Sequence, residues 1–106
     1  MEYITADTGG KKVYIEKDQI ETILTRPEVW PVPEAEDNIL GLSVYGNELV
    51  VFYREGTVEE APCGIIIRAG ERLLGIGAQS LGEENVDREE LEGIIPGVWE
   101  RKIDEA

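Results

Sequence analysis

The chain has 106 residues, of which 42% are hydrophobic, and its 23 acidic and 10 basic side chains give a formal net charge of −13. This length suits one small domain and leaves little room for a deep catalytic cleft. The acidic excess disfavours nucleic acid and anionic membranes as partners, because both attract clustered Lys and Arg. The sequence has no apolar run long enough to cross a bilayer and no signal peptide, so it predicts a cytoplasmic protein.

The cysteine and histidine content excludes several kinds of active site. With one cysteine and no histidine, the chain cannot form an internal disulfide, a Cys/His zinc site or a histidine-based triad. No thiolate-stabilising cation neighbours Cys63 in sequence, so we expect an unreactive thiol that is buried or half-buried. Gly75-Ile76-Gly77 lacks the third glycine of a phosphate loop, and the adjacent acidic pairs lack calcium-loop spacing. The sequence predicts no catalytic residue, no metal and no cofactor.

The first part of the chain predicts a hairpin and then a short helix. Apolar runs at 3–6 and 13–15 flank a turn whose Asp and paired glycines suit a β-hairpin. Asp18, with Glu21 three residues later, resembles a helix-capping box before apolar residues at helical spacing. Pro27 would end this helix.

The middle of the chain predicts an extended connection and a second hairpin. Three prolines within residues 27–33 favour an extended segment, in which we expect Trp30 to cover the core. Apolar runs at 39–45 and 49–53 flank Gly46-Asn47, a two-residue loop suited to a tight turn. The second run is apolar throughout, which predicts a strand covered on both faces.

The last part predicts a third hairpin, a helix and a final strand. Residues 54–62 are polar and are expected to form an exposed loop, followed by strands at 64–68 and 72–78. A second capping-box pattern predicts a short helix within 87–96, and 98–99 begins a strand. Short strands in hairpins indicate a mainly β fold, and we expect it to close into a barrel that hides its strand edges.

Several segments, in this order, resemble the CheW-like domain of bacterial chemotaxis, and the similarity runs from about residue 3 to about residue 102. The segments are the early hairpin, the Ile/Leu-rich stretch at 15–24, the proline-bearing stretch at 29–33, the hairpin at 38–53 and the strands at 63–67 and 72–78. The order and spacing of these segments carry the resemblance.

The resemblance implies two small SH3-like, five-stranded β-barrels packed together, with one or two short helices and no catalytic activity. Members of this family couple chemoreceptors to the histidine kinase CheA through apolar barrel surfaces. Their chains normally continue through further strands and a C-terminal helix. We therefore expect the second barrel to be incomplete, or completed at an open sheet edge by a partner's strand.

The resulting hypothesis is a single domain over residues 1–106, with a frayed tail at 103–106, that acts as a non-enzymatic signalling adaptor. Its expected partners are a CheA-type histidine kinase and a chemoreceptor, with apolar contacts giving affinity and the acidic surface favouring a basic partner. The candidate contact residues are Leu42, Val44, Tyr45, Leu49 and Val51. Two alternatives stay open: a small β-domain with a carboxylate-lined ligand or catalytic site, and a divergent family member that self-associates through an open sheet edge.

Overall fold

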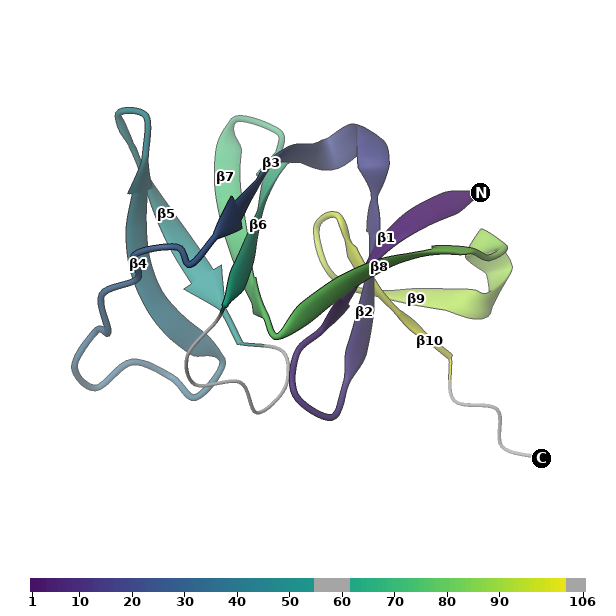
Figure 1. Ribbon diagram of the computed structural model, residues 1–106, viewed down its shortest axis with the longest axis horizontal. Coiled ribbons are helices and arrows are strands. Elements are labelled where there is room, and N and C mark those ends of the chain that lie inside the picture. Colours follow the sequence, from purple (N-terminus) through teal and green to yellow (C-terminus); the bar gives the residue numbers. More distant parts are fainter. Residues whose placement is uncertain (55–61, 103–106) are drawn as a thin grey trace.

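The computed structural model describes residues 1–54 and 62–102, and over these residues the chain forms ten strands and two single-turn 3₁₀ helices (Figure 1). The elements in chain order are β1 (Glu2–Asp7), β2 (Lys12–Glu16), η1 (Lys17–Gln19), β3 (Ile20–Thr25), β4 (Ile39–Tyr45), β5 (Glu48–Tyr53), β6 (Cys63–Ala69), β7 (Arg72–Ala78), β8 (Ser80–Asn85), η2 (Arg88–Glu90), β9 (Leu91–Ile95) and β10 (Val98–Arg101). The predicted mainly β fold is confirmed.

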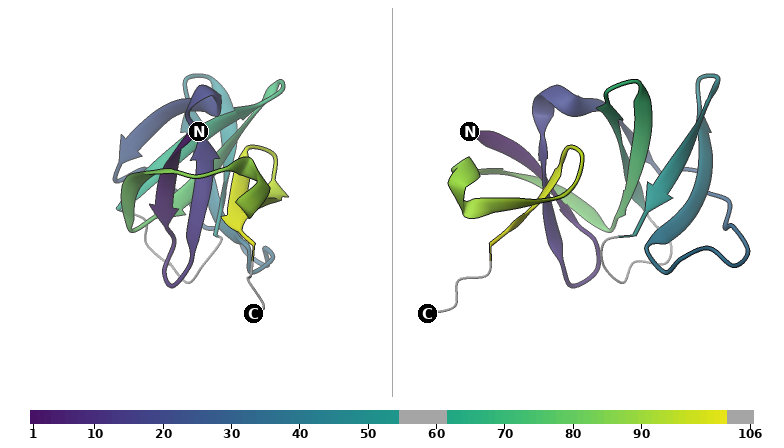
Figure 2. Two further views of the ribbon diagram at one scale, coloured as in Figure 1. Left: turned by 90° about the vertical axis from the view of Figure 1, so that its right-hand side faces the viewer. Right: turned by 180° about the vertical axis from the view of Figure 1, so that it is seen from behind.

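The strands form two five-stranded sheets. The first sheet has the order β8-β1-β2-β10-β9 and the second has the order β3-β6-β7-β5-β4. The two sheets lie at opposite ends of the long axis of the molecule, as the view from behind shows (Figure 2). All neighbouring strands pair antiparallel except β5 and β7, which are parallel.

The three predicted hairpins are confirmed: β1–β2 and β6–β7 lie inside their sheets, and β4–β5 forms one edge of the second sheet. β1 pairs with β2 around a turn in which the Thr8 amide donates to the Lys11 carbonyl at 2.8 Å. β4 pairs with β5 across Gly46-Asn47, and β6 pairs with β7 across a turn at Gly70. The final strand predicted at 98–99 is β10, which pairs with both β2 and β9.

The two predicted helices are wrong beyond a single 3₁₀ turn each. Residues 20–25 form β3, in which four of six residues are β-branched, and its pairing with β6 outweighs the capping pattern at Asp18. Residues 91–95 likewise form β9, because the apolar residues there pair with β10 instead of continuing η2. Helix propensity is a weak preference that tertiary pairing overrides.

Three apolar clusters form the interior. One lies between the sheets and takes residues from both; another belongs to the second sheet alone, and the third to the first sheet with residues that flank it. The inter-sheet cluster is Ala6, Val13, Ile15, Ile65, Ile67, Ile76, Ala78 and Val98; the second-sheet cluster is Leu40, Val50, Phe52, Ile66 and Leu73; and the first-sheet cluster is Tyr3, Tyr14, Val86 and Leu91. Adjacent residues such as Ile65 and Ile66 therefore serve different clusters, because successive strand residues face opposite sides.

Each sheet has five strands, the number that the resemblance implies for each of the two units. Within the described residues, however, the two edge strands of each sheet do not pair with each other, so neither sheet closes into a barrel. Connecting segments add to the clusters instead: Val86 packs in the first-sheet cluster and Val29 packs against the second-sheet cluster.

Two sequence predictions fall mostly or wholly outside the described residues, namely the exposed loop at 54–62 and the frayed tail at 103–106. Over residues 1–54 and 62–102, no helix is long and apolar enough to cross a bilayer.

Candidate protein-binding surface

The β4–β5 hairpin brings four of the five predicted contact residues onto one face. Leu42 lies opposite Val51, and Val44 lies opposite Leu49. Residues paired in this way point to the same side of the sheet. The Leu49 side chain is 71% exposed and that of Val44 is 54% exposed, whereas Leu42 and Val51 are half-buried. The prediction that β5 is covered on both faces is therefore wrong at Leu49.

The fifth predicted residue, Tyr45, lies on the other face of the hairpin. It follows Val44 in β4, so its side chain points to the opposite side, where it packs against the buried second-sheet cluster. It shares that side with Val50, which is fully buried. The structure therefore places Tyr45 against the core and separates it from the other four residues.

Trp30 joins the exposed face, although the sequence predicted it as a cover of the core. Its amide donates to the Leu42 carbonyl at 2.7 Å, and the Leu42 amide donates to the Trp30 carbonyl at 2.8 Å. This isolated antiparallel bridge places Trp30 beside Leu42, and its side chain is 50% exposed. Val29, the preceding residue, packs inward instead. Because Trp30 pairs with β4, adjacent side chains of this segment point to opposite sides, and no local sequence signal marks which of them is exposed.

Gly41 permits this close approach of the connection to β4. A Cβ at this position would collide with the Trp30 carbonyl and with the Val29 side chain. The register of β4 against β5 also shifts between Ile39 and Gly41. The proline-rich connection thus lies against β4 where β4 has no side chain. We call the exposed set, Trp30, Leu42, Val44, Leu49 and Val51, the apolar face.

The apolar face continues the side of the second sheet that packs on the first sheet. Val51 pairs with Leu74, and Leu74 pairs with Ile67, which is buried between the sheets. Along this row the side chains change from buried at Ile67 to half exposed at Trp30. β4 and β5 lie at the end of the molecule far from the first sheet (Figure 1), so, within residues 1–54 and 62–102, the first sheet does not extend over this part of the row.

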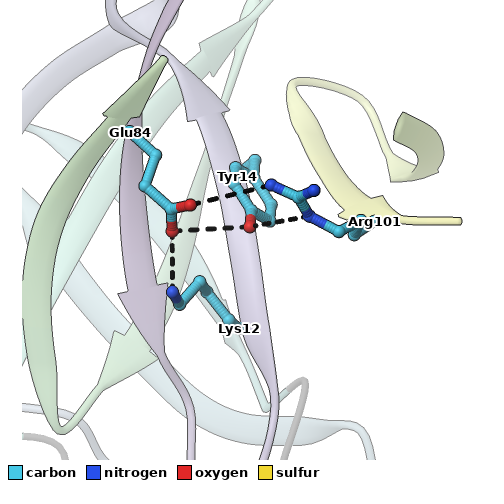
Figure 3. A network of polar contacts seen from close by, with 4 residues as sticks. All are labelled: Lys12, Tyr14, Glu84 and Arg101. Atoms are coloured by element: carbon cyan, nitrogen blue, oxygen red, sulfur yellow. Dashed lines mark hydrogen bonds and ion pairs between the residues drawn. The ribbon is translucent and has the colours of Figure 1, made fainter. Parts of the chain in front are cut away.

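The first sheet carries a different candidate, a polar network centred on Glu84 (Figure 3). Lys12 donates to Oε2 of Glu84 at 2.7 Å, and the Tyr14 hydroxyl lies 3.4 Å from the same oxygen. Arg101 donates through Nε to the Tyr14 hydroxyl at 3.4 Å and places Nη2 at 3.7 Å from Oε1 of Glu84. This is where a carboxylate-lined site, one of the open alternatives, would be sought.

The negative charge of Glu84 in this network is paired with the positive charges of Lys12 and Arg101. The hydrogen bond from Lys12 is the main cause that lowers the pKa of Glu84, and the same bond raises the pKa of Lys12. Glu84 is therefore held as an anion between two cations, an arrangement suited to joining β2, β8 and β10. Over the described residues, no group of three or more acidic or cysteine side chains is placed to hold a metal ion.

No protein-family model matches the chain, and no curated protein matches it in sequence. The function is therefore inferred from the apolar face and from the arrangement of the two sheets.

Proposed function

We propose that this protein is a non-enzymatic adaptor that binds protein partners through the apolar face. The main observation that supports this proposal is that Trp30, Val44 and Leu49 are each at least half exposed and belong to one continuous face. Isolated exposed apolar residues are common on proteins, whereas a contiguous set that includes a tryptophan is typical of interaction sites.

The energetics of this face favour binding. A tryptophan buries roughly 150–250 Å² when fully covered, so half exposure leaves about 100 Å² open. Covering that area contributes about 2.5 kcal/mol at roughly 25 cal/mol per Å², before the cost of association. Val44 and Leu49 add to this, and their strand backbone is already ordered, so little further entropy is lost on binding.

The proposed adaptor is CheW-like and couples a chemoreceptor to a CheA-type histidine kinase in the cytoplasm. Two observations support this more specific proposal. The chain has two five-stranded sheets, each with its own cluster and a third cluster between them, and this agrees in strand number with the two packed units that the resemblance implies. Four of the five residues of the apolar face also lie on the β4–β5 hairpin, which is one of the segments in the resemblance.

The test is a titration of this protein with the regulatory domain of a CheA-type kinase and with a chemoreceptor tip. The informative variant is Val44→Ser with Leu49→Ser, because both side chains are exposed. Ile23→Ser is the matched control, since Ile23 is 47% exposed on β3, away from the hairpin. Tyr45→Ala is unsuitable, because the Tyr45 ring packs against the second-sheet cluster.

We expect calorimetry to show binding to at least one of the two proteins, a loss of about tenfold or more in the double variant, and wild-type affinity in Ile23→Ser. Binding to neither protein contradicts the adaptor role. Binding that the double variant leaves unchanged contradicts the assignment to this face. Sedimentation of the protein alone tests self-association, which would favour that alternative.

A further inference from the structure

The acidic charge of this protein is not evenly neutralised. Residues 27–53, which supply the whole apolar face, include five acidic residues and no basic one. Four of the five lie on the connection between β3 and β4, and all five are exposed. They are Glu28, Glu34, Glu36, Asp37 and Glu48.

Ion pairs within the described residues use other carboxylates. On the first sheet and its flanking turns, Lys11 pairs with Glu100, Lys12 and Arg101 with Glu84, Lys17 with Glu2 and Glu83, and Arg88 with Glu16. On the second sheet, Arg68 pairs with Glu21 of β3 at 2.9 Å. Over the described residues, none of these ion pairs therefore involves a carboxylate of residues 27–53, and the basic residues that border this segment are Arg26 and Arg54.

The four carboxylates of the connection lie on the same segment as Trp30. In Figure 1 the connection crosses β4 and then passes below it, whereas the β4–β5 and β6–β7 turns lie at the opposite end of the sheet. Arg72 begins β7 at that opposite end. The face is thus flanked by negative charge beside Trp30 and by a mixed set of charges at the turns.

We infer that the apolar face binds a basic, extended or helical segment of a partner protein, with its Lys or Arg residues beside Trp30. This inference names the partner's chemistry and rests on the proposed function. An arginine at this place stacks on the exposed indole and reaches Glu28 or Glu34, so cation–π and ion-pair contacts act together. The apolar side chains of the same segment cover Val44 and Leu49.

A second copy of this chain is a poor occupant of the face. Each copy carries a net charge of −13, and an isologous contact would bring two sets of these carboxylates together. Such like-charge contacts oppose association, whereas a basic segment is attracted from a distance and binds faster at low salt.

The probe for the test is a short peptide that alternates leucine with arginine and contains one tryptophan, compared with a matched peptide that has glutamate at each arginine position. Two doubly substituted proteins are compared with the wild type: Glu28→Lys with Glu36→Lys, beside Trp30, and Glu89→Lys with Glu92→Lys, on exposed positions of the first-sheet side. Both double variants change the net charge equally, so they separate a local effect from a general one.

We expect the arginine peptide to bind the wild type and the glutamate peptide to fail. The double variant Glu28→Lys with Glu36→Lys should weaken binding of the arginine peptide about tenfold or more. The double variant Glu89→Lys with Glu92→Lys should have a smaller effect. The double variant Val44→Ser with Leu49→Ser should also weaken binding. Affinity of the wild type should fall as sodium chloride is raised. Equal effects of the two charge variants, equal binding of both peptides, or binding that salt leaves unchanged would overturn the inference.

The same comparison separates this inference from the proposed function. If the kinase regulatory domain binds at the apolar face but its affinity is insensitive to salt and to Glu28→Lys with Glu36→Lys, the adaptor proposal stands and the basic partner is wrong. If the arginine peptide binds as expected while neither the kinase domain nor the chemoreceptor tip binds, the inference stands and the CheW-like role fails.

Discussion

The ring of Phe52 lies against the backbone of Gly75, so closely that a Cβ on Gly75 would come within 2.6 Å of the ring. Gly64, on β6, stands in the same relation to the ring at 2.8 Å. Phe52 is fully buried in the second-sheet cluster. The Phe52 ring of β5 can therefore pack against the neighbouring strands β6 and β7, because these two strands have no side chain at Gly64 and Gly75.

Replacing Gly75 by alanine should destabilise the protein by about 1–3 kcal/mol, because the added methyl group overpacks a filled core. Gly93→Ala is the matched control, since a Cβ there would meet Trp99 at an ordinary 3.6 Å. Urea unfolding measures both variants. Adding Phe52→Leu to Gly75→Ala should recover part of the loss, and a strictly additive double variant would show that the two positions are not coupled.

Neighbouring residues of β5 should respond in opposite ways to truncation. Leu49→Ser should change the free energy of unfolding by less than about 0.5 kcal/mol, because the side chain is 71% exposed. Val50→Ala should cost about 2 kcal/mol, because Val50 is fully buried and its lost methyl groups leave a cavity. Chemical denaturation of the two variants checks the orientation of the strand, and a large loss in Leu49→Ser would show that its side chain packs against the protein.

Much of the fold was predictable, because hairpins are specified by short segments. Gly46-Asn47 and the paired glycines at 9–10 determine turns, and the flanking apolar runs determine the strands. The failures came where long-range pairing decides the outcome. β3 has apolar residues at helical spacing, and only its partner β6 makes it a strand. β8 contains a single apolar residue and is defined by its pairing with β1.

The candidate surface was predictable in part for a related reason. The strand period places Leu42, Val44, Leu49 and Val51 together once the turn is known. The same period separates Tyr45 from Val44, so its inclusion as a contact residue conflicts with the alternation of the strand. The position of Trp30 depends on a bridge to Leu42, which is twelve residues away, and no local pattern specifies that contact.

The Glu84 network should stabilise the protein at neutral pH and lose its effect in acid. The pKa of Glu84 is lowered, chiefly by the hydrogen bond from Lys12, so the folded state favours the carboxylate. A group with a lowered pKa stabilises the fold fully above its ordinary value, here 4.5, and the stabilisation is lost as the pH falls through the lower folded value.

The measurement is the difference in unfolding free energy between wild type and Glu84→Gln as the pH is lowered. The wild type should be more stable at about pH 7, and the difference should shrink below about pH 4.5 and then vanish. Glu92→Gln is the control, because Glu92 is exposed on β9 outside the network. A difference that persists unchanged in acid would show that Glu84 acts through packing and not through its charge.

The negative field around Trp30 should be visible in fluorescence quenching. The chain has two tryptophans, Trp30, half exposed, and Trp99, partly buried under the Arg88 guanidinium. Because the connection that carries Trp30 also carries four carboxylates, caesium should quench Trp30 more strongly than iodide does at equal concentration, and added salt should reduce the contrast. The contribution of Trp30 is the part of the quenching that disappears in Trp30→Phe.

The double variant Glu28→Lys with Glu36→Lys should reverse the preference of the quenching towards iodide, whereas Glu89→Lys with Glu92→Lys should leave the preference nearly unchanged. Equal quenching of Trp30 by the two ions at low salt would mean that the carboxylates of the connection do not act on the apolar face.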